Sequence, residues 1–201
     1  MGQIVIQPKK ADREAMYQAQ VVLCPLKQSA QDFDAIVEIA SATQVPIFCH
    51  ASDIPKLKEE GFGAYRFHKL EGYREVDFQG GAVEFFPAKK KVVGALASFF
   101  QEAGELLGFT KPYAYHVMIR PVNEKSILYL ASSQLDSADI AVFKKLAPSI
   151  VVGSCESTRE SWKVIGEQLN QNIIFEEDIE SIVTTDFMVT ENQLLGTLEV
   201  S

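Results

Sequence analysis

The chain has 201 residues, of which 47% are hydrophobic and 23% are charged, a composition typical of a globular protein with a sizeable core. Its formal net charge of -8 repels phosphate backbones, which argues against generic nucleic-acid binding. The three cysteines form neither a disulfide framework nor a CxxC motif, so a reducing compartment is expected. No apolar stretch has the roughly 18 residues of a membrane span, and none resembles a signal peptide. We therefore expect one cytoplasmic domain over residues 1–201.

The N-terminal part alternates short β-branched runs with helical patterns. Three apolar runs predict strands: 4–6, 21–24 and 45–49. The apolar spacing of residues 31–42 predicts a helix between the second and third of these strands. Asp53 followed by Pro55 predicts a helix start, because aspartate caps free amides and proline fits the first turn. That helix is expected to end at Gly61.

The middle of the chain predicts antiparallel structure. Its strand candidates are 64–67, 76–78, 83–86, 113–119 and 126–130. Gly80 and Gly81 supply the positive φ angles that a tight hairpin turn demands, so 76–78 should pair with 83–86. A second hairpin is expected around Asn123. Residues 92–107 predict an apolar-rich helix between the two hairpins, and an exposed face on it would favour a homo-oligomer.

The last third resumes the alternation of strands and helices. Helices are predicted over 138–146 and 157–169, and strands over 149–152 and 173–175. Residues 187–189 and 194–200 read as β structure that would cover the edge of a sheet.

Several of these stretches, in this order, resemble the small metal-dependent hydrolases of the metallo-β-lactamase type. Residues 22–34 are similar to the strand that leads into their HxHxDH metal motif. Residues 86–90 resemble the strand end that carries a third metal histidine, and 127–134 the strand that ends in Gly-Asp-Thr. The resemblance covers most of residues 3–155. It implies an αβ/βα sandwich of two mixed sheets packed face to face, with helices outside and without the family's first N-terminal strands.

The resemblance also assigns the positions of the metal ligands. One alignment puts the four motif ligands at Lys27, Ser29, Gln31 and Asp32, and an alignment shifted by two residues puts them at Pro25, Lys27, Ser29 and Ala30. The third histidine falls at Lys90 and the bridging aspartate at Ser133. Hydrolytic zinc needs three neutral or anionic side-chain ligands and an open position for water. We therefore expect no zinc here, although the family implies it.

None of the three histidines falls on a ligand position. His50 is interpreted as a strand-end residue, His68 as a solvated loop residue and His116 as a half-buried strand residue. Cys155 follows an apolar strand and precedes a helix, which is the geometry of a nucleophile elbow. The alternative interpretation is that Ser154 or Ser157 only caps that helix.

Three hypotheses follow. The first is a non-catalytic metallo-β-lactamase-like protein that acts as a binding or assembly module through the former cleft or a sheet edge. The second is a hydrolase with replaced chemistry, in which Cys155, or Lys27 with Lys90, acts on an anionic ester or phosphoester. The two lysines would also suit a small anionic ligand. The third is an unrelated doubly wound α/β fold, which a parallel sheet without hairpins would reveal.

Overall fold

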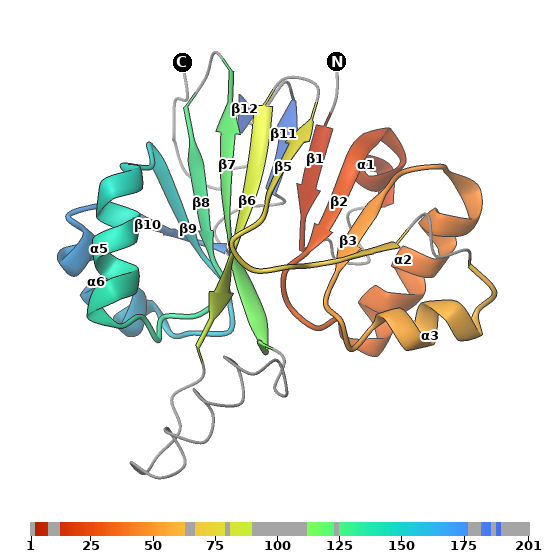
Figure 1. Cartoon of the computed structure of the whole chain (residues 1–201), viewed down its shortest axis with the longest axis horizontal. Coiled ribbons are helices and arrows are strands. Elements are labelled where there is room, and N and C mark those ends of the chain that lie inside the picture. Colours follow the sequence, from red (N-terminus) through yellow and green to blue (C-terminus); the bar gives the residue numbers. More distant parts are fainter. Residues whose placement is uncertain are drawn as a thin grey trace, which may run out of the picture.

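The computed structural model describes residues 3–7, 13–62, 67–78, 81–89, 112–122, 125–176, 182–185 and 188–189. Within these ranges, two six-stranded sheets pack face to face, and helices lie against the outer face of each sheet (Figure 1). This is the αβ/βα sandwich that the sequence predicted.

The first sheet is mostly parallel. Its strands are β1 (Gln3–Ile6), β2 (Ala19–Cys24), β3 (Ile47–Cys49), β4 (Phe67–Lys69), β11 (Ile182–Thr185) and β12 (Met188–Val189), in the order β12-β11-β1-β2-β3-β4. Strands β1 to β4 run parallel, and β11 pairs antiparallel with β1, with Gln3 opposite Thr185. C-terminal β structure therefore covers the edge of β1, but the strand beside β1 is β11, which the sequence did not predict. Of the predicted segment 187–189, residues 188–189 form β12, which pairs with β11.

The second sheet contains both predicted hairpins. Its strands are β5 (Glu75–Phe78), β6 (Gly81–Ala88), β7 (Ala114–Pro121), β8 (Ile127–Leu130), β9 (Ile150–Gly153) and β10 (Ile173–Phe175), in the order β10-β9-β8-β7-β6-β5. Strands β5 to β8 are antiparallel, whereas β8, β9 and β10 are parallel. Gly81 is required beside the first hairpin turn, because a Cβ there would lie 2.5 Å from the Arg120 carbonyl oxygen. The hairpins exclude the doubly wound parallel sheet.

Helices α1 (Arg13–Gln18), α2 (Ala30–Ala42) and α3 (Ile54–Glu59) accompany the first sheet, and α5 (Ser137–Leu146) and α6 (Arg159–Leu169) cover the second (Figure 1). The sequence did not predict α1. It has six residues, too few for apolar periodicity to emerge, and Met16 is its anchor in the core. Among the described residues, no helix is both long enough and apolar enough to cross a bilayer.

Alternating side chains build the layers of the core. Ile4 and Ile6 point into the cluster between the two sheets, whereas Val5 packs against the helices of the first sheet. In the second sheet, Val117 faces the inter-sheet cluster and Met118 faces α5 and α6. Each central strand is thus apolar on both faces, which is why these strands read as continuous apolar runs in the sequence.

Other predicted elements lie wholly or partly outside the described residues, and one histidine differs from its prediction. The predicted helix at 92–107 and the predicted strand at 194–200 lie outside the described residues, as do residues 64–66 of a predicted strand. His68, predicted in a solvated loop, lies in β4, and its ring stacks on Phe48 with 4.8 Å between the ring centroids.

Candidate functional site

The carboxyl ends of β2, β3, β8 and β9 lie at one edge of the sandwich, together with the start of β7 (Figure 1). Two backbone contacts join the sheets there. The Tyr115 N–H donates to the Pro25 carbonyl oxygen over 3.0 Å, and Leu26 forms an isolated bridge with Ala114. Polar side chains that follow these strands therefore gather along the edge that corresponds to the predicted metal site.

The loop that resembles the metal motif serves to cap α2. Ser29 Oγ accepts a hydrogen bond from the Asp32 N–H over 3.2 Å and donates to Asp32 Oδ2 over 2.6 Å. Serine at this position satisfies an amide that the first helical turn leaves without a partner. Lys27 and Gln31 are exposed on either side of this cap. The structure thus brings Ser29 and Asp32 together, but as a helix cap.

Gln28 and Asp53 form a buried polar contact between the ends of β2 and β3. The Gln28 N–H donates to Asp53 Oδ2 over 3.3 Å, and Gln28 Nε2 donates to the Leu26 carbonyl oxygen over 3.2 Å. Asp53 is the N-cap residue of α3, where the sequence predicted a helix start, but its side chain makes no capping hydrogen bond, because the carboxylate accepts from the Gln28 N–H instead. Gln28 Oε1 and Asp53 Oδ1 have no hydrogen-bond partner within the described part of the chain. Burial of these two oxygens therefore lowers the free energy of unfolding.

His50 connects the two sheets. Its Nε2 lies 2.6 Å from the Pro112 carbonyl oxygen, and its Nδ1 lies 2.7 Å from Ser52 Oγ. Because a carbonyl can only accept, Nε2 carries the proton and Nδ1 accepts from Ser52, whose own N–H also donates to it over 3.2 Å. The interpretation of His50 as a plain strand-end residue missed this role. The His-x-Ser spacing signals the Ser52 contact, but the Pro112 contact spans 62 residues.

On the second sheet, Ser133 occupies the position that the resemblance assigns to a bridging aspartate. Its N–H donates to Ser157 Oγ over 3.0 Å, and its side chain is half-buried. The neighbouring Ser132 is buried and hydrogen-bonds the Tyr113 side chain. Burial raises the pKa of Tyr113, and the Ser132 hydrogen bond offsets part of that rise.

Cys155 is exposed beside a buried carboxylate. Its N–H donates to Glu176 Oε2 over 2.9 Å, and the Tyr129 hydroxyl donates to the same oxygen over 3.4 Å. Burial, followed by the charge of Glu176, raises the pKa of Tyr129 well above its usual range. Sequence reasoning missed Glu176, because 21 residues separate it from Cys155.

The serine caps predicted after β9 are wrong. Thr158 is the N-cap of α6, and its side chain accepts from the Ser161 N–H. Ser154 instead donates from its buried hydroxyl to the Ala131 carbonyl oxygen over 2.8 Å, which ties the end of β9 to the end of β8. The Ser157 hydroxyl oxygen accepts from the Ser133 N–H.

Three lysines, residues 89–91, follow β6, and the structure describes the first of them. Lys90 lies outside the described residues, so its pairing with Lys27 stays a prediction. Lys89 forms an ion pair with Asp136, and its Nζ lies 3.9 Å from Asp139 Oδ1. It therefore ties the end of β6 to the start of α5.

A zinc ion does not fit these positions. The described motif positions offer an ammonium, two hydroxyls, an amide and one carboxylate, Asp32, which is engaged by Ser29. Zinc prefers imidazole, thiolate and carboxylate, and a lysine beside it adds repulsion. Among the described residues, no group of three or more His, Cys, Asp or Glu side chains is arranged to hold a metal ion. No catalytic step through a metal can be derived from this arrangement.

Comparison with known proteins places the fold. No family model matches the sequence, and no curated protein matches it significantly. Among solved structures, an isothiocyanate hydrolase from Delia radicum gut bacteria is 15% identical, with a TM-score of 0.56 over 81% of this chain and 64% of its own. A possible metal-dependent hydrolase from Veillonella parvula is 12% identical, with a TM-score of 0.54 over 84% and 65%.

The metallo-β-lactamase fold protein YhfI from Bacillus subtilis is 9% identical, with a TM-score of 0.54 over 86% of this chain and 73% of its own. The chain therefore spans slightly less than two thirds of the first two of these structures, at 64% and 65%. Identities at this level establish the architecture and not the activity. Its two mixed sheets, its outer helices and these structural matches show that the chain has the metallo-β-lactamase fold.

Proposed function

We propose that this chain is a binding module of the metallo-β-lactamase fold that works without a metal ion. The observation that carries the proposal is the cap of α2, where Asp32 is held 2.6 Å from Ser29 Oγ. Asp32 is the one carboxylate among the described motif positions, and this contact commits it to the helix. Lys27 adds a positive charge on the same loop, which opposes a dication.

Hydrolysis is the main alternative to a binding role. Two of the similar structures are described as hydrolases, one of them as possibly metal-dependent. Those descriptions belong to chains that extend well beyond the part matched here. A binding module keeps the sandwich as a rigid frame and needs no reacting group. This agrees with polar side chains along the edge that hydrogen-bond to backbone groups of neighbouring loops.

Elemental analysis of the purified chain tests the proposal directly. We expect far less than one equivalent of zinc, iron or manganese after dialysis with each metal, because fewer than three suitable ligands converge in the part of the chain that the structure describes. Asp32→Asn is the informative variant, and Asp34→Asn, on the exposed side of α2, is its matched control. One or more equivalents of bound metal in the wild type would overturn the proposal, and loss of that metal in Asp32→Asn but not in the control would assign it to the motif positions.

A second candidate is a hydrolase with replaced chemistry, acting on an anionic ester. His50 favours it, because a hydroxyl lies at one ring nitrogen and an anchoring oxygen at the other. In such a reaction, Ser52 Oγ would attack the ester carbonyl carbon and pass its proton to His50 Nδ1, which would return it to the departing alkoxide. Water, deprotonated by the same nitrogen, would then cleave the acyl-Ser52 ester, release the acid and restore the Ser52 hydroxyl. The Ser52 N–H competes for the same nitrogen and weakens this candidate.

An ester and phosphoester panel decides between the two candidates. Activity that is lost in Ser52→Ala would support the hydroxyl version, and activity lost on alkylation of Cys155 would support the thiol version. Absence of turnover across the panel by folded protein is the outcome expected for a binding module.

A further inference from the structure

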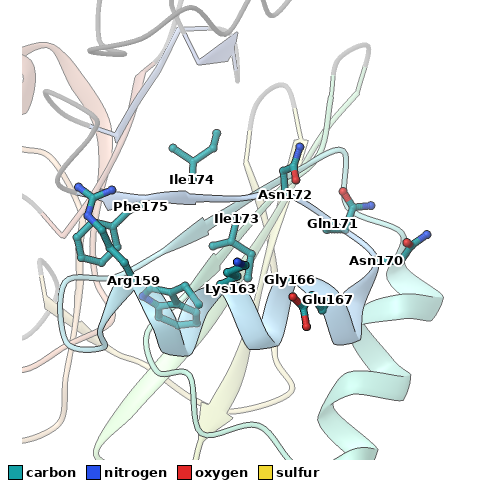
Figure 2. Close-up of a pocket in the computed structure, with 11 residues that line it drawn as sticks. Arg159, Lys163, Gly166, Glu167, Asn170, Gln171, Asn172, Ile173, Ile174 and Phe175 are labelled. Carbon is teal, nitrogen blue, oxygen red and sulfur yellow. The ribbon is translucent and has the colours of Figure 1, made fainter.

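A cavity of about 820 Å³ lies on the flank of the second sheet, between α6 and β10 (Figure 2). Buried Trp162 and Phe175 contribute to its lining, together with the half-buried Ile173. The carboxamides of residues 170–172 line the end where α6 turns into β10. This cavity is lined by none of the residues assigned to the former metal site.

Charges are ordered along one wall of the cavity. Arg159, Lys163 and Glu167 lie four residues apart on α6, so they share one face of the helix and line the cavity in that order (Figure 2). The Arg159 guanidinium stacks over the Phe175 ring, 4.4 Å from its centroid, which places it at the Phe175 end. Two cations therefore adjoin one end and a carboxylate lies toward the other, although the whole chain carries a net charge of -8.

The other wall is the edge of a sheet. Within the described part of the chain, β10 pairs with β9 on one side and has no strand on the other. Its residues are two isoleucines and a phenylalanine, without the lysine or proline that natural edge strands use to prevent pairing. An unpaired strand edge offers backbone donors and acceptors to another extended chain.

We propose that this groove binds an extended acidic segment of a partner protein, which adds to β10 as a further strand and places a carboxylate between Arg159 and Lys163. This inference rests on the proposed function as a binding module and names its surface. An acidic peptide can contact both walls at once. Its backbone can hydrogen-bond to the edge of β10, and its carboxylate can pair with the two cations. A second copy of this chain fits less well, because Glu167 is the one carboxylate among the lining residues, whereas an acidic peptide can present several carboxylates to the two cations.

The test measures fluorescence anisotropy with a labelled peptide of alternating valine and glutamate. Its comparison peptides alternate valine with lysine, or carry the acidic sequence with alternate amides methylated. Lys163→Glu is the informative variant, and Lys144→Glu, an exposed lysine of α5, is its matched control. Both variants have the same net charge, so a difference between them reports the site and not the overall field.

We expect the acidic peptide to bind and the lysine peptide to bind at least about tenfold more weakly. Lys163→Glu should weaken binding about fivefold and Lys144→Glu less than about twofold, because exposed charge pairs contribute modestly. Amide methylation should weaken binding about tenfold or more, since it removes backbone donors.

Three outcomes would overturn the inference: no binding of the acidic peptide, equal binding of the methylated peptide, or equal effects of the two lysine variants. Metal content is measured on the same samples. A metal-loaded protein would refute the proposed function, whereas a metal-free protein that ignores the peptide would refute the groove alone.

Discussion

Mild acid should destabilise this protein through His116. The ring is 1% exposed on β7, its Nδ1 accepts from the Ala131 N–H over 3.2 Å, and it meets the Phe143 ring edge-on at 5.4 Å. Within the described part of the chain, its Nε2 has no hydrogen-bond partner. Burial lowers the pKa of His116 from 6.5 to about 3, because a charged ring would lose its hydration there. The prediction of a half-buried strand position understated this burial.

The sign and size of the effect follow from proton linkage. Between the ordinary pKa of 6.5 and the folded pKa of about 3, the unfolded chain binds a proton that the folded chain does not. Stability is therefore fully present above pH 6.5 and falls as the pH drops toward 3. Each pH unit in that window removes about 1.4 kcal/mol from the free energy of unfolding. Moving from pH 7 to pH 5 should thus cost about 2 kcal/mol.

Urea unfolding at the two pH values measures this loss. His116→Asn offers an oxygen for the Ala131 N–H and removes the titration, so its stability should change little between the two pH values, although it starts lower. His68→Asn is the control, because His68 is exposed and should leave the loss intact. An equal loss of stability in wild type and His116→Asn would refute the reasoning.

Three further predictions concern other parts of the sandwich. Asp136→Ala should cost about 1–2 kcal/mol in urea unfolding, because it removes the capping box of α5 and an exposed ion pair with Lys89, and Asp136→Asn should cost less. Since the Lys89 hydrogen bond lowers the pKa of Asp136, this contribution should disappear as the pH falls below the carboxyl's ordinary 3.8. Gly153→Ala should lower the free energy of unfolding by about 1–3 kcal/mol, because the added Cβ would lie 2.6 Å from the Trp162 ring. It should also shift the fluorescence emission of the single tryptophan, and unchanged emission and stability would contradict this packing. A thiol reagent should modify Cys155 alone in the native protein, and Cys24 and Cys49 only after denaturation, because both are buried and burial raises the pKa of Cys49 to about 12. Reaction of more than one thiol in the native protein would contradict that burial.

The fold could be predicted because its strands are buried on two faces and its hairpins carry their own turn signals. The run at 21–24 is apolar at each position, and the structure divides it between two clusters. Gly80 and Gly81 likewise indicated the first hairpin before any pairing was known. Local signals of this kind determine elements and their order.

The site was less predictable because its contacts are long-range. Asp53 has the local sequence signature of a side-chain cap, yet its carboxylate accepts a hydrogen bond from the Gln28 backbone N–H instead. No residue near Asp53 in the sequence indicates this contact. The contact between Cys155 and Glu176 and the contact between His50 and Pro112 likewise depend on how the strands are ordered in space. The resemblance located the Ser29 and Asp32 positions, but it could not tell that they form a cap.

The pairing of β1 with β11 has a consequence for synthesis of the chain. Gln3 is synthesised some 180 residues before its partner Thr185. Until then, one side of β1 has no strand to receive its amides, and the nascent sheet presents an open template to other chains. Closure of the first sheet is therefore a late, non-local event, and a half-made chain is the form of this protein most in need of a chaperone.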